Sequence, residues 1–319
     1  MKRRFLTIAN PISGTASKNR LGDFVVRCFN ELKMKNELLF TGGGGDARRF
    51  AEEAVASGSV DAILVIGGDG TVNEVASALC GSDVRMGIIP SGSGNGLARH
   101  LGLPLDPVEA FKVTLNGHSI ACDYATANGK PFFCTFGVGF DARVSHAFSK
   151  CKRRGKFAYL RVIIHESKSY KPQKYRVSTP DCNFSREALI LAVCNSSQYG
   201  NNAYIAPHAS LTDGLLDITV VNTGNPLDLA RNSIELFTGF IKNNRRFETL
   251  RATTLTIESE KQMEGHLDGE PVMFPQKIEI ECHPKSLNVY CAGEPEFKPI
   301  LTPITGTLQE IQAALSKQF

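Results

Sequence analysis

In the first third of the sequence, strand-like and helix-like patterns follow one another without interruption. Residues 5–9 and 61–66 are apolar runs typical of buried strands, whereas apolar residues recur at helical spacing over residues 21–32. This order predicts a parallel sheet with helices on both faces. Further strands are expected at 37–41 and 85–90, and further helices at 46–57 (with Asp46 as N-cap), from about 72 and from about 97.

Three glycine-rich segments lie where the expected strands end, at residues 41–47, 67–71 and 91–96. Ligands of such sheets bind at the carboxyl ends of the strands, and backbone N–H groups at a helix N-terminus attract anions. Glycine lets a phosphate approach the backbone because it has no β-carbon. The segments therefore predict a phosphate site, with a plain strand-to-helix turn as the alternative. The carboxylate of Asp69 predicts a divalent cation between itself and the phosphate.

The pattern changes after about residue 116. A hairpin turning at Asn128-Gly129 is followed by short strand-like runs, with helices expected only over 156–166 and 226–242. This favours an antiparallel β-sandwich, so the expected fold class is α/β followed by all-β. The strand-like runs cover residues 174–180, 187–196, 214–221, 249–259, 276–283 and 285–291.

The change of pattern divides the chain into two expected domains, which also suits a length of 319 residues. Residues 1–118 would form the α/β domain, and residues 119–294 would form the β-sandwich domain. Residues 295–319 end in a short amphipathic helix and are a candidate completion of the first domain.

The composition argues against several classes of protein. A net charge of +4 is too small to indicate nucleic acid as a partner, and no apolar run reaches the roughly 18 residues of a membrane helix. The nine cysteines have no C-x-x-C spacing. This spacing argues against disulfides and zinc sites, and a reducing cytoplasm is the expected location.

Five segments together resemble one known family. They read "ANPISG", "GGDGTVNEV", "PSGSGNGLARHLGLP", "APHASLTDGLLDI" and "HLDGEPV", in this order from residue 9 to residue 272. The chain from about residue 4 to 291 resembles the diacylglycerol kinase catalytic-domain superfamily, which includes bacterial diacylglycerol kinases and sphingosine kinases. The resemblance implies an ATP- and Mg-dependent lipid kinase of NAD kinase/diacylglycerol kinase-like fold, with its active site between the domains.

The resemblance also implies which residues bind ATP. In the family, the segment matching residues 67–73 holds the nucleotide, and Thr41 and Ser93 would line the same pocket. The Walker pattern with its lysine is absent, so the phosphates would be held without a P-loop. The implied ATP-binding residues are Asn10, Thr41, Gly67, Gly68, Asp69, Gly70, Thr71, Asn73, Gly92, Ser93 and Asn95.

In the second domain, the resemblance implies a metal site and a catalytic base. Magnesium would be bound by the carboxylate of Asp213 and by the main-chain carbonyls of Ser210 and Leu215. Glu270, in "DGE", would orient the acceptor hydroxyl and take its proton, with Asp69 as a second catalytic residue. Taken alone, the Asp-Gly pairs of both segments would be interpreted as turns.

The acceptor is predicted to be the hydroxyl of a sphingoid base or of diacylglycerol. The segment "GSGNGLA" is closer to sphingoid-base kinases than to the G-T-x-N-D of bacterial diacylglycerol kinases. Sphingosine kinases have an acidic residue near the position of Asp141, where it could pair with the sphingoid amine. The alternative is that Asp141 braces the domain junction. Asp268 is expected beside the same substrate.

The basic run Lys150, Lys152, Arg153 and Arg154 is compatible with docking on an anionic membrane, with a solvated loop as the alternative. The predicted location is therefore the cytoplasm, with peripheral contact at the inner face of the membrane. The sequence does not decide whether the protein forms a homodimer.

Two other functions are considered. An NAD kinase shares "GGDGT", but it would need a second N-E pair well downstream, where this chain has "HLDGE". A non-catalytic nucleotide- or lipid-binding regulator would be expected to lack an active-site residue. Asp69, Asp213 and Glu270 are all present, which favours a lipid kinase.

Overall fold

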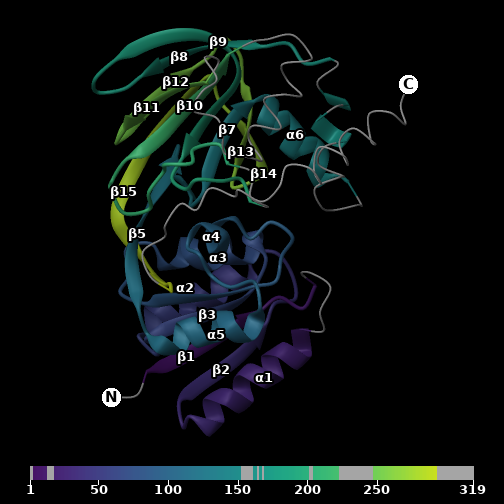
Figure 1. The fold of residues 1–319 in the computed structure, drawn as a ribbon, viewed down its shortest axis with the longest axis vertical. Helices are drawn as coiled ribbons and strands as arrows, with labels where there is room; N and C mark the ends of the chain where they lie inside the picture. The colour runs from purple at the N-terminus through teal and green to yellow at the C-terminus, as the bar shows by residue number, and fades with distance from the viewer. Residues whose placement is uncertain are drawn as a thin grey trace, which may run out of the picture.

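The first part of the computed structural model is a parallel sheet in the order β2-β1-β3-β4. Strands and helices alternate along the chain, as the sequence pattern predicts (Figure 1). The elements are β1 (Arg4–Ala9), α1 (Lys18–Glu31), β2 (Lys35–Phe40), α2 (Asp46–Ser57), β3 (Ala62–Gly67), α3 (Asp69–Leu79), β4 (Arg85–Pro90), α4 (Gly96–His100) and α5 (Pro107–Asn116). The structure describes residues 3–12, 18–151, 161–163, 165–166, 169–200, 204–222 and 247–292.

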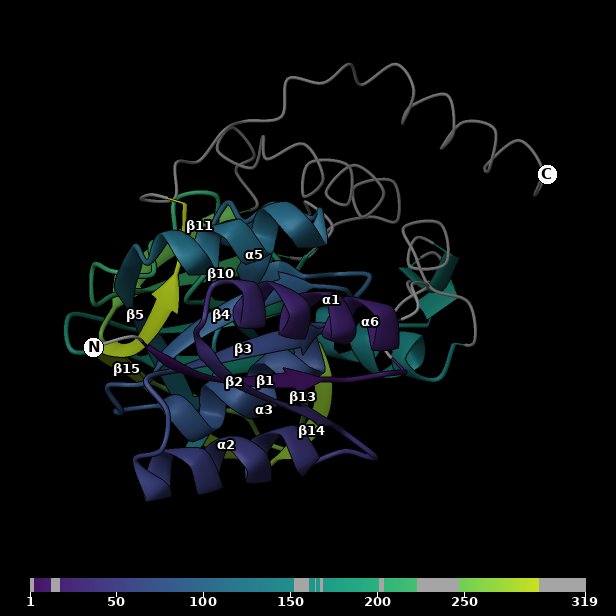
Figure 2. The same ribbon diagram turned by 90° about the horizontal axis from the view of Figure 1, so that it is seen from below.

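Helices cover both faces of this sheet (Figure 2). All six residues of β3 are buried, and its side chains alternate between two cores. Ile63 and Val65 pack with residues of α2 and α3, whereas Leu64 and Ile66 pack with residues of α1 and α5. The predicted α/β part of the fold is therefore confirmed.

The second part of the chain consists mainly of antiparallel strands, with helix α6 beside them (Figure 1). Phe136, Val193, Ile218 and Ile257 belong to the core among these strands. The predicted all-β part is confirmed, as is the hairpin turn at Asn128-Gly129. The elements are β5 (Ser119–Ala127), β6 (Lys130–Phe132), β7 (Thr135–Gly139), α6 (Phe140–Ser149), β8 (Gln173–Ser178), β9 (Asn183–Cys194), β10 (Leu216–Asn222), β11 (Phe247–Ala252), β12 (Thr254–Glu258), β13 (Met263–Leu267), β14 (Glu270–Phe274) and β15 (Lys277–Tyr290).

The long strand β15 belongs to both parts of the molecule. It pairs antiparallel with β12 and β5 in the second part, whereas Val289 near its end pairs in parallel with Met86 of β4. The pairing of β15 with β5 shifts register between His283 and Leu287. The expectation of two separate strands here is wrong, because a bulge bends one strand without ending its pairing.

Three local predictions also differ from the structure. Helix α5 was not expected, although Asp106 as N-cap and Pro107 in the first turn are clear start signals. Helix α6 was not expected either, and it follows β7 directly because Gly139 takes a φ of 104°. Asp46 is the first residue of α2, and the N-cap is Gly45.

Several predicted features lie outside the described residues. These are the helix at 226–242, the tail 295–319, and Lys152, Arg153 and Arg154 of the basic run. Lys150 is described and exposed. Of the helix expected at 156–166, the described residues 161–163 and 165–166 are helical.

Candidate active site

The second and third glycine segments contact each other at the ends of β3 and β4. The N–H of Ser91 donates to the carbonyl of Gly67 at 2.9 Å, which joins the two strand ends. A β-carbon on Gly92 would lie 2.6 Å from the Cα of Gly68, and one on Gly68 would lie 3.1 Å from the Cα of Gly92. Glycine at both positions therefore lets the two segments touch, in addition to any contact with a ligand.

Asp69 holds the third segment in place. Its Oδ2 accepts the N–H of Asn95 at 2.8 Å, and its Oδ1 accepts the N–H of Gly96 at 2.7 Å. Gly96 is the first residue of α4, whose N-terminal N–H groups favour a carboxylate. The structure thus gives Asp69 a structural partner in the protein, where the sequence suggested a cation.

Asn95 closes the third segment on itself. It has a left-handed φ of 52°, and its side chain both accepts the N–H of Gly92 and donates to the carbonyl of Gly92, each at 2.9 Å. Only 8% of Asn95 is exposed, whereas Ser93 is exposed. Of these two predicted ATP ligands, Ser93 is therefore the accessible side chain.

The first glycine segment is capped by protein carboxylates. Asp46 Oδ2 accepts the N–H groups of Gly42 and Gly43 at 2.8 and 3.0 Å. Glu74 on α3 accepts the N–H of Gly45 at 3.0 Å and that of Ala47 at 3.1 Å. These amides are satisfied without a phosphate, so this segment is a less suitable anion site than the sequence suggested. The capping role of Glu74 was missed, because it depends on how α2 and α3 pack.

The N-terminus of α3 is the part of the site best suited to an anion. The first N–H groups of a helix have no partner within the helix, and the structure records no acceptor for those of Gly70 and Thr71 among its described residues. Gly70 is exposed, and no described atom lies within 4 Å of a β-carbon built on it. Asn10 donates from Nδ2 to Thr71 Oγ1 at 3.0 Å, which ties the end of β1 to this helix.

Asp268 joins α3 to the second part of the molecule. It lies in the tight turn between β13 and β14, with a left-handed φ of 50°. Its carboxylate accepts the N–H groups of Phe133, Cys134 and Thr135 at 2.7–2.8 Å, and Asn73 donates to it from Nδ2 at 3.1 Å. Burial raises the pKa of Asp268, while the three N–H donors act in the opposite direction. These contacts make Asp268 a link between the two parts of the molecule, rather than a free carboxylate that could bind substrate.

Glu270 lies two residues after Asp268, at the start of β14. Its side chain is exposed and makes no hydrogen bond or ion pair with any described residue. Side chains alternate along a strand, so Glu270 points to the same face of the β13–β14 hairpin as Val272 and Phe274. An exposed carboxylate can bind and orient a hydroxyl group, and Glu270 lies two residues after the Asp268 that contacts α3.

Asp141 is buried and already paired. Its Oδ2 accepts the hydroxyl of Tyr199 at 2.9 Å and lies 3.3 Å from Nε2 of His266. His266 Nδ1 accepts the N–H of Gly269 at 3.3 Å, so the proton of the neutral ring is on Nε2 and is donated to Asp141. Asp141 and His266 are only 5% and 2% exposed. This arrangement agrees with the alternative that Asp141 braces the structure. His266 and Tyr199 were not identified from the sequence.

The residues implied for magnesium already have a positive partner. Asp213 Oδ1 accepts the N–H of Leu215 at 3.1 Å, and its Oδ2 lies 3.6 Å from the guanidinium of Arg251. Ser210 bonds through its hydroxyl to Thr212. Within the described residues, no three His, Cys, Asp or Glu side chains converge as a metal site. The pairing of Asp213 with Arg251, rather than a lack of oxygen ligands, is what argues against a magnesium ion here.

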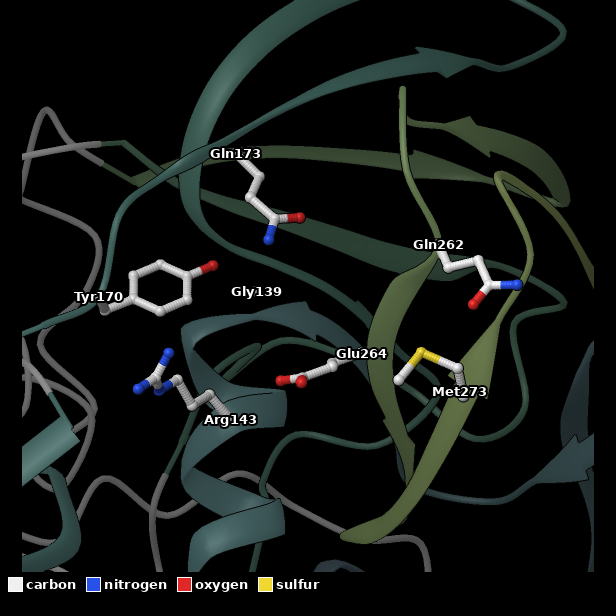
Figure 3. Close-up of a pocket in the computed structure, with 7 residues that line it drawn as sticks. All are labelled: Gly139, Arg143, Tyr170, Gln173, Gln262, Glu264 and Met273. Carbon is white, nitrogen blue, oxygen red and sulfur yellow. The ribbon is translucent and has the colours of Figure 1, made fainter.

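A cavity of about 280 Å³ opens on the outer face of the β13–β14 hairpin (Figure 3). Its lining residues come from α6, β8, β13, β14 and the segments beside them. Glu264 and Met273 are paired across the hairpin, and they lie on the face opposite to Glu270. We therefore do not expect the acceptor hydroxyl that Glu270 would contact to lie in this cavity. The lining residues are Gly139, Arg143, Tyr170, Gln173, Gln262, Glu264 and Met273.

His100 at the end of α4 forms a second contact between the two parts. Its Nδ1 accepts the N–H of Ser197 at 3.1 Å and lies 2.8 Å from the hydroxyl of Ser197. Its Nε2 is buried without a hydrogen-bond partner in the described part of the chain. Burial lowers the pKa of His100 to about 4. The imidazole is therefore neutral in the folded protein at neutral pH.

This pKa predicts a loss of stability in acid. The unfolded chain takes up the proton first, near pH 6.5, so the contribution is present above that pH and is lost as the pH falls towards about 4. At about 1.4 kcal/mol per pKa unit, the loss amounts to about 3 kcal/mol. Denaturant unfolding of the wild type and His100→Gln should show the steeper decline in the wild type. His118→Gln, which changes an exposed histidine, is the matched control. Parallel curves for wild type and His100→Gln would contradict the prediction.

Comparisons with known proteins agree with this fold. Residues 4–127 match the diacylglycerol kinase catalytic domain, and residues 134–291 match the YegS C-terminal NAD kinase beta sandwich-like domain. A protein of Pseudomonas aeruginosa (strain UCBPP-PA14) named "Probable lipid kinase YegS-like" is 32% identical over 256 residues, covering 79% of this chain and 83% of that protein. A Mycobacterium tuberculosis (strain H37Rv) protein named "Diacylglycerol kinase" is 29% identical, covering 88% and 93%.

The fold is also shared with a solved structure. The crystal structure of a diacylglycerol kinase from Bacillus anthracis str. Sterne superposes with a TM-score of 0.71 at 24% identity, covering 91% of this chain and 97% of that one. The match to the catalytic domain and the two named relatives define a kinase, a phosphotransferase that acts on an alcohol group. The chain belongs to the family of lipid kinases that carry the diacylglycerol kinase catalytic domain. None of the helices in the described residues is long and apolar enough to cross a membrane.

Proposed function

We propose that the protein transfers the γ-phosphoryl group of ATP to a lipid hydroxyl, at the place where Asn73 of α3 contacts the β13–β14 turn. One observation carries the proposal. The hydrogen bond between Asn73 and Asp268 ties the helix after the second glycine segment to the turn that precedes Glu270. Glu270, which would orient the hydroxyl, therefore follows one partner of this hydrogen bond. The N-terminus of α3, which attracts phosphate, precedes the other partner.

The residues present suit phosphoryl transfer, which depends mainly on positioning and on neutralising charge. The N–H groups of Gly70 and Thr71 would hold phosphate oxygens at the start of α3. Bound to the nucleotide, magnesium would supply further positive charge. Glu270 would accept a hydrogen bond from the acceptor hydroxyl and take its proton as the new bond forms. Asp69 would support this site indirectly, by holding the third glycine segment.

The acceptor we propose is a neutral lipid alcohol of the diacylglycerol type. The sphingoid alternative required Asp141 to pair with an amine. That carboxylate is 5% exposed and is engaged by Tyr199 and His266. Breaking a buried, paired carboxylate away from its partners would be costly. A relative named for diacylglycerol supports the same choice.

Label transfer from γ-labelled ATP tests the proposal. Diacylglycerol, a sphingoid base and NAD would be offered separately, the lipids in mixed micelles, each with excess magnesium. Label in diacylglycerol alone is the expected result. Label in the sphingoid base would support a lipid kinase but would reject diacylglycerol as its acceptor. Label in NAD, or in none of the three while ATP still binds, would reject the proposed function.

A further inference from the structure

The guanidinium group of Arg251 uses all three of its nitrogens on one segment, residues 208–217. Its Nε donates to Asp217 Oδ1 at 3.1 Å, and its Nη2 donates to the carbonyl of His208 at 3.1 Å. Its Nη1 lies 3.6 Å from Asp213 Oδ2. Arg251 itself is on β11, which pairs with β10 so that Arg251 lies opposite Asp217, the last residue of this segment. The positive charge that contacts this segment therefore belongs to a side chain of the neighbouring strand β11.

The partners of Arg251 are the kinds of oxygen that hard divalent cations prefer. Two carboxylates and one main-chain carbonyl surround the guanidinium, which stays charged at any pH the protein would meet. A divalent ion bound to Asp213 would share a carboxylate with a permanent positive charge, and the two would repel each other. The site thus has a place for one positive charge, and the guanidinium group of Arg251 already supplies it.

Of the two other acidic groups here, Asp217 depends on Arg251 and Asp123 does not. Asp123, 1% exposed, is satisfied by the N–H groups of Gly214 at 2.6 Å and Lys285 at 2.7 Å. Asp217 is 8% exposed, and its Oδ2 has no hydrogen-bond partner in the described structure. Removing Arg251 would leave Asp213 and Asp217 without the guanidinium group that pairs with both. The segment would then become a real binding site for a divalent ion.

We propose that Arg251 takes the place of the magnesium ion that the family resemblance implies at Ser210, Asp213 and Leu215. Residues 208–217 keep their conformation without a divalent ion, and any magnesium needed for catalysis arrives with the nucleotide. The inference does not rest on the proposed acceptor or on catalysis. It can be tested without measuring activity.

Thermal unfolding in EDTA and in millimolar MgCl₂, without nucleotide, tests the idea. The wild type should melt at the same temperature in both. Arg251→Met should melt roughly 5 °C lower in EDTA and recover most of this loss in MgCl₂. Arg251→Lys keeps a positive charge, so it should not respond to magnesium. Arg186→Met is the matched control, because Arg186 is similarly exposed (45% against 43%) but pairs with Glu248.

Calorimetric titration of Mg²⁺ into the nucleotide-free protein gives a second readout. No heat of binding is expected for the wild type, whereas folded Arg251→Met should bind about one ion. Binding to the wild type that disappears in Asp213→Asn would overturn the proposal, because the family's metal site would then coexist with Arg251. The proposal would also be overturned if magnesium neither raised the melting temperature of Arg251→Met nor bound to it. Arg251 would then not stand in the place of a metal ion.

Discussion

Glu270→Gln is expected to lower kcat by about 100- to 10,000-fold, the range seen when a general base is lost. Glutamine has nearly the same shape and can still bond to the acceptor hydroxyl, but it cannot take the proton. Stability should change by less than about 0.5 kcal/mol, because the exposed Glu270 side chain contacts no described partner that would be lost. Steady-state kinetics with the lipid acceptor, together with a melting curve, measures both effects.

Glu281→Gln provides the control for Glu270. Glu281 is also an exposed strand glutamate of the second part, on β15, and it should keep wild-type kcat. A Glu270→Gln enzyme with kcat within about threefold of wild type would mean that a water or another group accepts the proton. A fall in KM together with kcat would point to relieved strain in the bound substrate.

Asp268→Ala is expected to destabilise the protein by about 3–5 kcal/mol. The substitution leaves the N–H groups of Phe133, Cys134 and Thr135 without their acceptor and frees Asn73. It also puts alanine at a left-handed φ of 50°. Asp268→Asn should lose less, because asparagine tolerates this conformation and retains one carbonyl oxygen. Denaturant unfolding would measure both variants.

Lys33→Ala separates the effect of backbone conformation from that of hydrogen bonding. Lys33 has a φ of 53°, is exposed, and has no side-chain hydrogen bond within the described residues. Its replacement should change the free energy of unfolding by less than about 0.5 kcal/mol. If Asp268→Ala were no more destabilising than Lys33→Ala, the carboxylate could not be joining the two parts of the molecule.

The periodic features of the sequence predicted the fold well. Alternating apolar runs located the strands of the parallel sheet, and Asn-Gly located the hairpin at residues 128–129. The glycines of the second and third segments marked a real feature of the fold, because a close approach of two backbones leaves a direct trace in residue type. Such local signals do not depend on knowing which elements pack together.

The partners of the acidic residues could not be predicted in the same way. Asp69, Glu74 and Asp268 all accept backbone N–H groups, but the donors come from other elements of the fold. A carboxylate looks the same in a sequence whether it binds a metal, caps a helix or joins two parts of a chain. Arg251 was missed for the same reason, since the residues it contacts lie 34 or more positions away.

The path of β15 has a consequence for the order in which the protein can fold during synthesis. Met86 of β4 pairs with Val289, which leaves the ribosome roughly 200 residues later. Until then one edge of the nascent parallel sheet has open hydrogen-bonding groups, and such edges promote aggregation. A chain that stops at residue 127, where the match to the catalytic domain ends, would keep that edge permanently. The half of the protein that contains the parallel sheet is thus expected to need the last strand of its neighbour before it is released as a stable, soluble product.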